Sequence, residues 1–386
     1  MKDTRFPFRF FFLFAAFYSC QAFYGPYLNL FLSEKGFNNT QIGLTVSLST
    51  LALLVAQPFW GLVSDKARYK NTILIILILG SIFISYLFPR VHGHWILVLM
   101  VTLNAVFYYP IMPLSDNLAL EFLNNKKWNF GQVRAGGTLG FSLTVIAAGF
   151  LINDQYTRIF YYVIFTLLIT LVISFTLPRV HGHRRGLDRA PVKMIFKNQT
   201  LVCLLFYYLA FSLGTSLFFS FYPIYYISIG GKSSFIGIML FFTAMSELPF
   251  FFFADKLIKK FGVYPMILAA GVFTSIRWFL FYVSANPVFI LSASLLHGVG
   301  FVTISYTIAT HINTNVPKEL RATGQTMVAL ILAFFSRILF GYIGGILCDR
   351  FGVVPMLLAA SIMTIAATII FAVWFPRIKP DNGFAE

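Results

Sequence analysis

The stretch RVHGHRRGLDRAPVK, residues 179–193, determines how this chain is organised. It opens the only long polar interruption, residues 179–199, between two series of apolar runs. Each run holds about 20 residues, which is enough for a helix to cross a hydrocarbon layer of about 30 Å. We therefore predict an all-α membrane protein with twelve transmembrane helices in two six-helix bundles, 1–178 and 200–386, joined by a cytoplasmic central loop. The predicted spans are 8–32, 42–64, 71–89, 95–118, 134–153, 157–178, 200–228, 235–254, 264–284, 288–311, 322–347 and 353–375.

The composition supports the membrane class. Of the 386 residues 58% are hydrophobic and 11% are charged, whereas soluble domains carry about 25% charged residues. The net charge of +16 lies in short loops rather than on a solvated face, which argues against a nucleic-acid partner. Cys20, Cys203 and Cys348 lie in spans and do not have the spacing of metal ligands. We therefore expect these cysteines to serve as small apolar residues, and we expect neither a metal nor a cofactor.

The distribution of basic residues predicts the orientation. If both termini are cytoplasmic, most of the 29 lysines and arginines fall on the cytoplasmic side. The outer loops then hold only Lys35, Arg90, Arg158, Lys232 and Arg350. The basic, apolar N-terminus lacks a small-residue cleavage site, so we interpret it as the first helix rather than a signal peptide. We expect a protein of the bacterial inner membrane.

One short motif occurs twice. PRVHGH follows the third predicted span at 89–94 and the sixth at 178–183. The two copies would lie on opposite sides of the membrane, as two inverted three-helix repeats would place them. Chance is the alternative explanation for a match of this length.

Two ionisable residues fall inside the N-terminal spans, where such side chains are costly and usually functional. Asp116 lies in PIMPLSDNLALEF and Arg134 in FGQVRAGGTLGF. Both lie near the cytoplasmic end of consecutive spans, so they can pair. The pair either contributes to a substrate site or only joins two helices. The run Gly136, Gly137 and Gly140 predicts that another helix packs closely against this span.

Three neighbouring C-terminal spans each carry one ionisable residue, namely Glu247, Arg277 and His297. Packed together, they would form a buried cluster. Histidine has an ordinary pKa of about 6.5, which suits a proton relay in a transporter. The alternative is a cluster that only neutralises itself.

Further candidates for the substrate site are aromatic or cationic. Tyr24, Tyr27 and Tyr108 lie beside glycines or prolines that weaken their helices, and Trp278 follows Arg277. Arg337 has no evident acidic partner, so it either faces an anionic substrate or extends towards the membrane surface.

Motifs of soluble enzymes and of ATP-driven pumps are missing from the sequence. It contains no Walker loop, no HExxH and no GxSxG. We therefore expect a protein that is not an enzyme, and any energy for transport would come from an ion gradient.

The segment GLVSDKARYK, residues 61–70, together with the 6 + 6 layout, resembles the major facilitator superfamily. The superfamily's loop motif has the form G-x-L-x-D-[RK]-x-G-[RK]-[RK]. Gly61, Asp65, Lys66 and Lys70 match it, whereas Val63, Arg68 and Tyr69 depart from it. The resemblance implies two bundles that alternately open to either side, with Asp65 helping to hold helices together during that motion.

A narrower resemblance covers most of the chain. MPLSDNLAL, NFGQVRAGGTLGF, SELPFF, SIRW and LLHGVGF are similar to the phenylpropionate permease group and, more distantly, to lactose permease, an oligosaccharide/proton symporter. The resemblance implies sugar-type binding by Asp116 and Arg134, which are 18 residues apart, and proton coupling by Glu247, Arg277 and His297. One departure is important. Gly300 stands where lactose permease carries its proton on a glutamate, so Glu247 or His297 must carry the proton, or coupling is absent.

Together these features predict a proton-coupled symporter of a small organic solute. The solute would be an aromatic carboxylate or a glycoside or nucleoside, and the protein would act as a monomer in membrane lipid. The alternatives are a proton-coupled exporter and a non-transporting receptor with the same fold.

Overall fold

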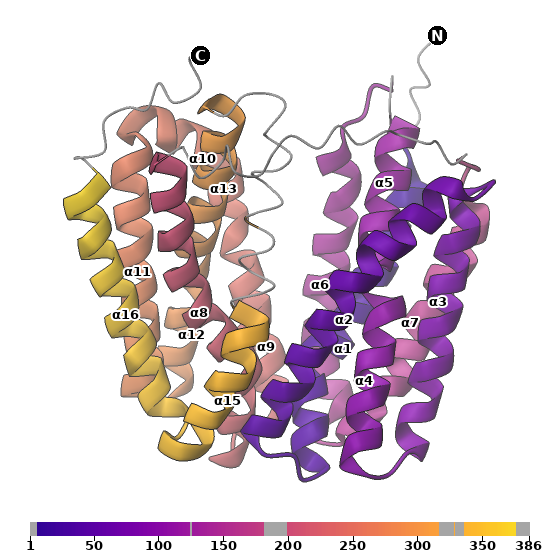
Figure 1. Ribbon diagram of the computed structural model, residues 1–386, viewed down its shortest axis with the longest axis horizontal. Helices are drawn as coiled ribbons and strands as arrows, with labels where there is room; N and C mark the ends of the chain where they lie inside the picture. Colours follow the sequence, from indigo (N-terminus) through magenta and orange to yellow (C-terminus); the bar gives the residue numbers. More distant parts are fainter. Residues whose placement is uncertain (1–5, 124–125, 181–198, 316–327, 329–335, 376–386) are drawn as a thin grey trace. The chain divides into compact units, whose positions relative to one another are not determined.

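A computed structural model describes residues 6–123, 126–180, 199–315, 328 and 336–375. All regular structure within these ranges is helical (Figure 1). The central loop from residue 181, half of the predicted span 322–347 and the C-terminal tail from residue 376 lie outside the described residues. Half of the second PRVHGH copy, residues 181–183, lies outside them too, so the inverted-repeat layout stays a prediction.

The chain groups into two compact units, which are described separately. The first comprises residues 1–186 with 230–238, and the second comprises residues 187–229 with 239–386. The helices of the first unit are α1 (Phe8–Glu34), α2 (Asn39–Lys66), α3 (Lys70–Leu87), α4 (His94–Tyr108), α5 (Ile111–Leu123), α6 (Phe130–Ile152) and α7 (Ile159–Thr176). Those of the second unit are α8 (Gln199–Ser228), α10 (Glu247–Phe261), α11 (Val263–Val283), α12 (Pro287–Leu295), α13 (His297–Asn315), α15 (Phe340–Phe351) and α16 (Val353–Trp374). The helix α9 (Ser233–Met245) begins in the first unit and ends in the second.

Ten helical stretches in the described ranges are long and apolar enough to cross a membrane. Some consist of two labelled helices, such as residues 94–123 and 287–312. The 27-residue helix α1 is not among the ten, because tyrosines and Gln21 lower its mean hydropathy. The total of twelve spans therefore stays a prediction.

Local sequence sets several helix ends. The side chains of Asn38 and Asn129 each accept a hydrogen bond from the backbone N–H three residues on, and the backbone N–H of each asparagine donates to the side-chain oxygen of Gln41 or Gln132. These reciprocal bonds satisfy donors that a helix N-terminus otherwise leaves unpaired.

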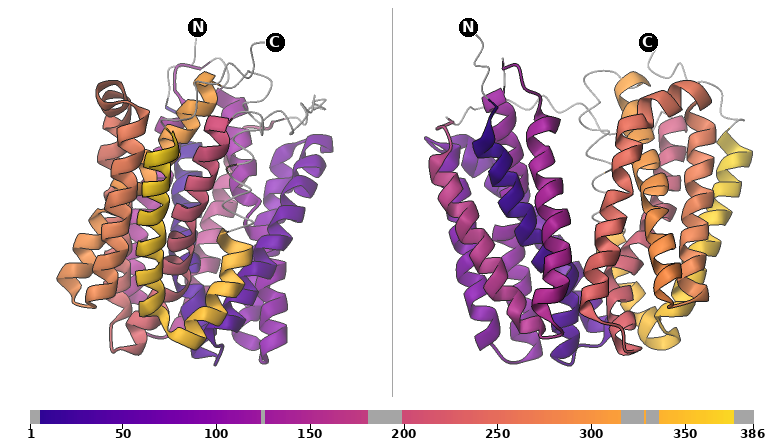
Figure 2. Two further views of the ribbon diagram at one scale, coloured as in Figure 1. Left: turned by 60° about the vertical axis from the view of Figure 1, so that its left-hand side comes forward. Right: turned by 180° about the vertical axis from the view of Figure 1, so that it is seen from behind.

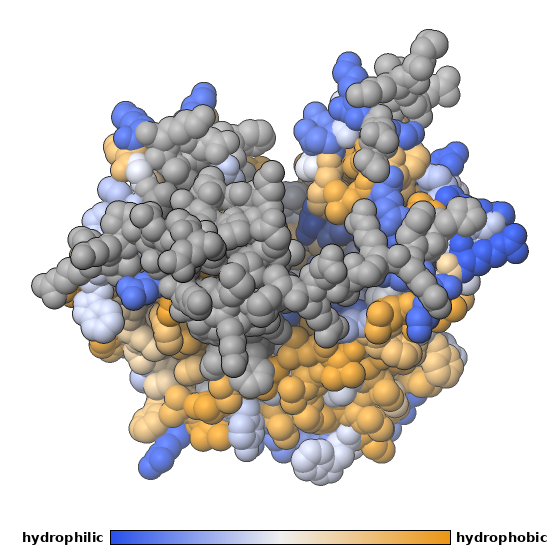
Figure 3. All heavy atoms as spheres, turned by 45° about the horizontal axis from the view of Figure 1, so that its top comes forward, coloured by the Kyte–Doolittle hydropathy of each residue, from blue (hydrophilic) through white to orange (hydrophobic). Residues whose placement is uncertain are grey.

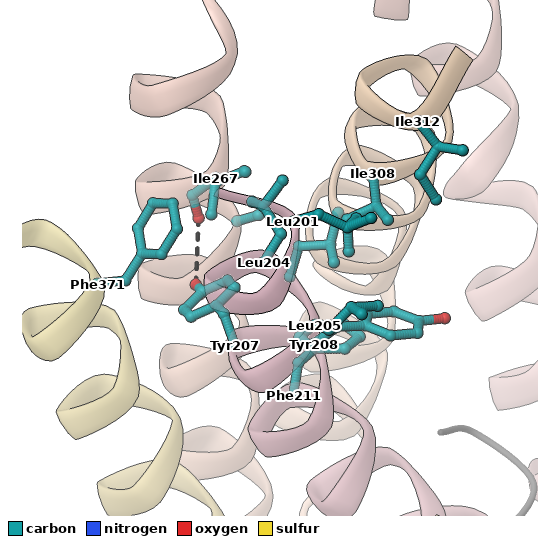
Figure 4. Close-up of a cluster of buried hydrophobic side chains, with 12 residues drawn as sticks. Leu201, Leu204, Leu205, Tyr207, Tyr208, Phe211, Ile267, Ile308, Ile312 and Phe371 are labelled. Atoms are coloured by element: carbon teal, nitrogen blue, oxygen red, sulfur yellow. Dashed lines mark hydrogen bonds between the residues drawn. The ribbon is translucent and has the colours of Figure 1, made fainter. Parts of the chain in front are cut away.

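In the first unit α1 packs against α6 and α7, while α3 contacts α4 and α7. In the second unit α11 lies beside α16 and α13, and α8 beside α16 (Figures 1 and 2). One core of the second unit gathers Leu204, Tyr208 and Ile308, and Tyr207 joins α8 to α11 by donating to the Ile267 carbonyl at 3.2 Å (Figure 4).

Large apolar side chains also cover the outside. Val55, Trp95 and Phe206 are exposed, and Figure 3 shows broad hydrophobic areas on the visible flank. Such a surface suits contact with lipid tails rather than water.

Candidate functional site

Two helices of the second unit are interrupted beside the predicted ionisable residues. The regular helix is interrupted for one residue at Ser246, between α9 and α10, and at Leu296, between α12 and α13, although the Leu296 backbone keeps right-handed helical dihedrals. Pro249 accounts for the first break, because it has no N–H to donate to the carbonyl of Met245 one turn earlier. Glu247 and His297 are therefore the first residues of the helices that resume.

The two interruptions touch each other. The N–H of Gly298 donates to the Ser246 hydroxyl at 2.9 Å, and this hydroxyl donates to the Thr243 carbonyl at 2.7 Å. A Cβ on Gly298 would lie 2.8 Å from the Glu247 backbone nitrogen, which real structures do not tolerate. Only glycine allows this approach of α13 to α10, and the approach brings the side chains of Glu247 and His297 together.

The three predicted residues form a chain of contacts with His297 in the middle. His297 Nε2 lies 3.3 Å from Glu247 Oε1, and His297 Nδ1 lies 2.9 Å from Arg277 Nη1. The imidazole packs on the ring of Phe301, with centroids 5.2 Å apart, and against the edge of Phe219. The ring is thus fixed between the carboxylate and the guanidinium.

This geometry determines which histidine nitrogen carries the proton. A guanidinium can only donate, so the Nδ1 that faces Arg277 must be the acceptor. The proton of a neutral His297 then lies on Nε2 and is donated to Glu247. A negative Glu247, a neutral His297 and a positive Arg277 together carry no net charge.

Burial increases along the chain of contacts. The Glu247 side chain is 26% exposed, that of His297 is 5% exposed, and Arg277 is 1% exposed. The guanidinium carbon of Arg277 lies 4.9 Å from the ring centroid of Phe218 and 4.5 Å from that of Trp278. Glu247 is therefore the most exposed member of the three.

The first unit contains the predicted pair of Asp116 and Arg134. Arg134 Nη1 lies 3.0 and 3.2 Å from the two carboxylate oxygens of Asp116, and Arg134 Nη2 donates to the hydroxyl of Tyr18. The side chains of Asp116 and Arg134 are 24% and 35% exposed, so the pair is accessible.

Tyr18 of α1 was missed by the sequence reasoning. Its ring packs where a Cβ on Gly137 would otherwise lie, and Gly136 and Gly140 approach the backbone of Phe11 and Ala15 on the same helix. The prediction that the glycine run packs closely against another helix is confirmed, and that helix is α1. The spacing of Phe11, Ala15 and Tyr18 on one helix face is the signal that could have indicated Tyr18.

Of the other predicted substrate residues, Trp278 contacts the Arg277 guanidinium, whereas among the described residues the three tyrosines have no recorded contact with either cluster's charged groups. Tyr24, Tyr27 and Tyr108 are buried within the first unit, where the Tyr24 and Tyr108 rings lie 4.9 Å apart. Trp278 is fully buried, with its indole nitrogen facing Gly214. Arg337 is exposed, on a turn of π-helix at residues 336–339.

In the loop motif, Lys70 is the residue that joins the other charged side chains. Its buried ammonium lies 3.2 Å from Asp65 and 2.5 Å from Glu121, and it donates to Asn117 at 2.9 Å. Glu121 was not among the predicted site residues, although it is four residues after Asn117 and thus on the same helix face.

The two other predicted residues of the loop motif make fewer contacts. Lys66 and Gly61 are exposed. A Cβ on Gly61 would meet no atom within 4 Å. Packing inside the first unit therefore does not require glycine at this position.

Comparison with known proteins identifies the family. The model of the family described as "MFS_1 like family" matches residues 4–372. Maltose permease of Geobacillus stearothermophilus is 27% identical over 381 residues, covering 96% of this chain and 93% of that protein. The probable 3-phenylpropionic acid transporter of Escherichia coli (strain K12) is 23% identical over 291 residues, covering 70% and 73%. The crystal structure of the nucleoside transporter NupG superposes with a TM-score of 0.83 at 16% identity, covering 95% and 98%, and shows the shared fold. These proteins are membrane transporters rather than enzymes, and the chain described here belongs to the MFS_1 like family.

Proposed function

We propose that this transporter couples the uptake of a small organic solute to a proton, and that Glu247 carries the proton. The observation that supports this most directly is the continuous contact chain from the accessible Glu247 through His297 to the buried Arg277. The solute is a sugar or nucleoside, or an aromatic carboxylate. The relatives named as maltose permease, nucleoside transporter and phenylpropionic acid transporter span these classes.

Glu247 is better suited to carry the proton than His297. A proton on His297 Nδ1 would face the donor Nη1 of Arg277 and break that contact. A proton on Glu247 leaves an oxygen that still accepts from His297 Nε2. It also removes a negative charge, which lowers the cost of closing the site away from water.

Asp116, Arg134 and Tyr18 would hold polar groups of the solute. The pair offers both donors and acceptors, and its partial exposure leaves it within reach of a ligand. The first unit would then supply polar solute contacts, while the second unit supplies the proton site. We further propose that the protein works as a monomer in the bacterial inner membrane with both termini cytoplasmic.

The test uses purified protein in liposomes with an imposed pH gradient. Accumulation of maltose, uridine and 3-phenylpropionate is measured, together with proton influx reported by a pH-sensitive dye. We expect accumulation of at least one solute with proton influx that depends on that solute. A lack of solute-dependent proton movement across the whole panel refutes the proposal.

Glu247→Gln separates coupling from folding. The amide keeps an oxygen for His297, so solute exchange without a gradient should persist while accumulation driven by the gradient is lost. Glu34→Gln, at an exposed carboxylate at the end of α1, is the matched control and should transport normally. Full accumulation by Glu247→Gln would exclude the proton role of Glu247.

A further inference from the structure

One edge of the most deeply buried arginine has no hydrogen-bond acceptor. Arg277 uses Nη1 for His297, whereas its Nε and Nη2 have no partner among the described residues. In a guanidinium, the N–H of Nε and one N–H of Nη2 point the same way and form the edge that grips two oxygens of a carboxylate. Leaving these donors unmet at 1% exposure is costly, so the edge has the character of a binding site.

The surroundings of this guanidinium are largely apolar, and Glu247 is the carboxylate that balances its charge. Aromatic rings of Phe218, Trp278 and Phe281 lie within 4.5–5.6 Å of the guanidinium carbon and provide π faces rather than hydrogen-bond acceptors. The helices α8, α12 and α16 carry no acidic, basic or histidine residue in their described ranges, α11 carries only Arg277, and α13 adds His311. On α10, Glu247 already faces His297, and Asp255 with three lysines lies two or more turns further on.

We propose that the Nε/Nη2 edge of Arg277 binds one monovalent anion, a carboxylate or a halide, and that Glu247 takes up one proton when the anion binds. The reason is charge balance. Glu247, neutral His297 and Arg277 sum to zero, so an added anion would leave a buried net negative charge. A proton from solution that bonds to a Glu247 oxygen restores neutrality, and no other bond is broken.

This inference rests on the proposed function, because it assigns the coupling of the same site. The binding of the anion to the protein would then be electroneutral, because one proton binds with each anion. Arg277 is 1% exposed, so an anion bound to it would be shielded from water. The aromatic rings around the guanidinium would contact the ring of an aromatic carboxylate.

The first experiment measures proton uptake by the purified protein in detergent. Sodium benzoate or sodium chloride is added to a weakly buffered solution near neutral pH, with sodium sulfate as the ionic background, and a pH indicator reports released or bound protons. We expect about one proton bound for each anion bound. Uptake with benzoate alone identifies a carboxylate site, and uptake with chloride as well identifies a site for small anions in general. No uptake with either anion overturns the inference.

Two variants give opposite results if the assignment is right. Glu247→Gln should bind the anion without taking up a proton, whereas Arg277→Lys keeps the charge but lacks the two-donor edge and should bind at least about tenfold more weakly. Thermal unfolding checks that both variants are folded. Proton uptake that persists in Glu247→Gln, or anion binding that persists at full strength in Arg277→Lys, overturns the assignment.

The failure of this inference differs from the failure of the proposed function. If maltose or uridine accumulates with protons and neither anion causes proton uptake, symport stands and the anion site does not. If anions cause proton uptake but no solute crosses the liposome membrane, the anion site stands and the proposed symport fails.

Discussion

Gly300 allows a quantitative test of helix packing in the second unit. A Cβ at this position would overlap the Thr274 hydroxyl on α11 and lie 3.3 Å from Phe211 on α8. Both neighbours are buried, Thr274 at 2% and Phe211 at 3% exposure, so neither can turn away into solvent. The glutamate that the resemblance to lactose permease would place here therefore has no room.

The magnitude for Gly300→Ala follows from two opposing effects. Alanine normally stabilises a helix by about 1 kcal/mol relative to glycine, whereas an extra methyl in a packed core costs about 1–3 kcal/mol. We expect the difference to be a net destabilisation of up to about 2 kcal/mol. Gly344→Ala is the matched control, because its nearest neighbour would be Phe221 at 3.6 Å, an ordinary contact. This control should be neutral or slightly stabilising.

Removal of the opposing hydroxyl should rescue the variant. In the Thr274→Ala background, Gly300→Ala should cost about 1–2 kcal/mol less than it does alone, because the overlap is gone. Thermal unfolding in detergent measures all four proteins, with about 2–4 °C expected for each kcal/mol in a unit of this size. Additive shifts, or equal shifts for Gly300→Ala and Gly344→Ala, would show that the close approach does not govern this position.

Three further predictions concern the first unit. Lys70→Met should lower stability by about 1–2 kcal/mol in thermal unfolding, since it leaves two carboxylates without their cation, although their exposures of 45% and 32% moderate the loss. Arg134→Lys should weaken solute binding by about tenfold in equilibrium titration, because an ammonium cannot reach both Asp116 and Tyr18 in the same planar geometry; unchanged affinity would place the solute elsewhere. Asp154 accepts from the backbone N–H of Ser233 at 3.1 Å at the start of α9, so Asp154→Ala should cost about 1 kcal/mol, while Asp154→Asn, which keeps an acceptor oxygen, should cost less.

Sequence reasoning was most successful for ionisable residues, whose burial in an apolar span costs free energy. Glu247, Arg277 and His297 were identified because each interrupts an apolar run, and the structure brings them together. Their order of contact was not predictable, because it depends on where Ser246 and Leu296 interrupt their helices. The spacing of residues along the chain does not show where a helix is interrupted.

Aromatic residues show the limit of such reasoning. Tyr18 touches Arg134, whereas Tyr24, Tyr27 and Tyr108 are buried away from it. A chain with 19 tyrosines and 47 phenylalanines offers aromatic rings on every helix face. Composition alone cannot separate a ring that contacts a charged pair from one that fills the core.

Lys70 illustrates a different limit. The loop motif directed attention to Asp65 by resemblance, while the buried charge at that place is the ammonium of Lys70. Its partner Glu121 comes from α5, 51 residues further along the chain. Pairing over such a separation requires knowledge of how α3 and α5 pack, which periodicity within one helix does not provide.

The start of α9 has a consequence for biogenesis. Residues 230–238 belong to the first unit, where Gly237 packs on the Val145 carbonyl and Ser233 satisfies Asp154. During synthesis the first unit therefore stays incomplete until α9 has left the ribosome and entered the membrane. Two separately expressed halves divided in the central loop would place this segment on the wrong fragment, so the N-terminal half alone should be the more readily degraded of the two.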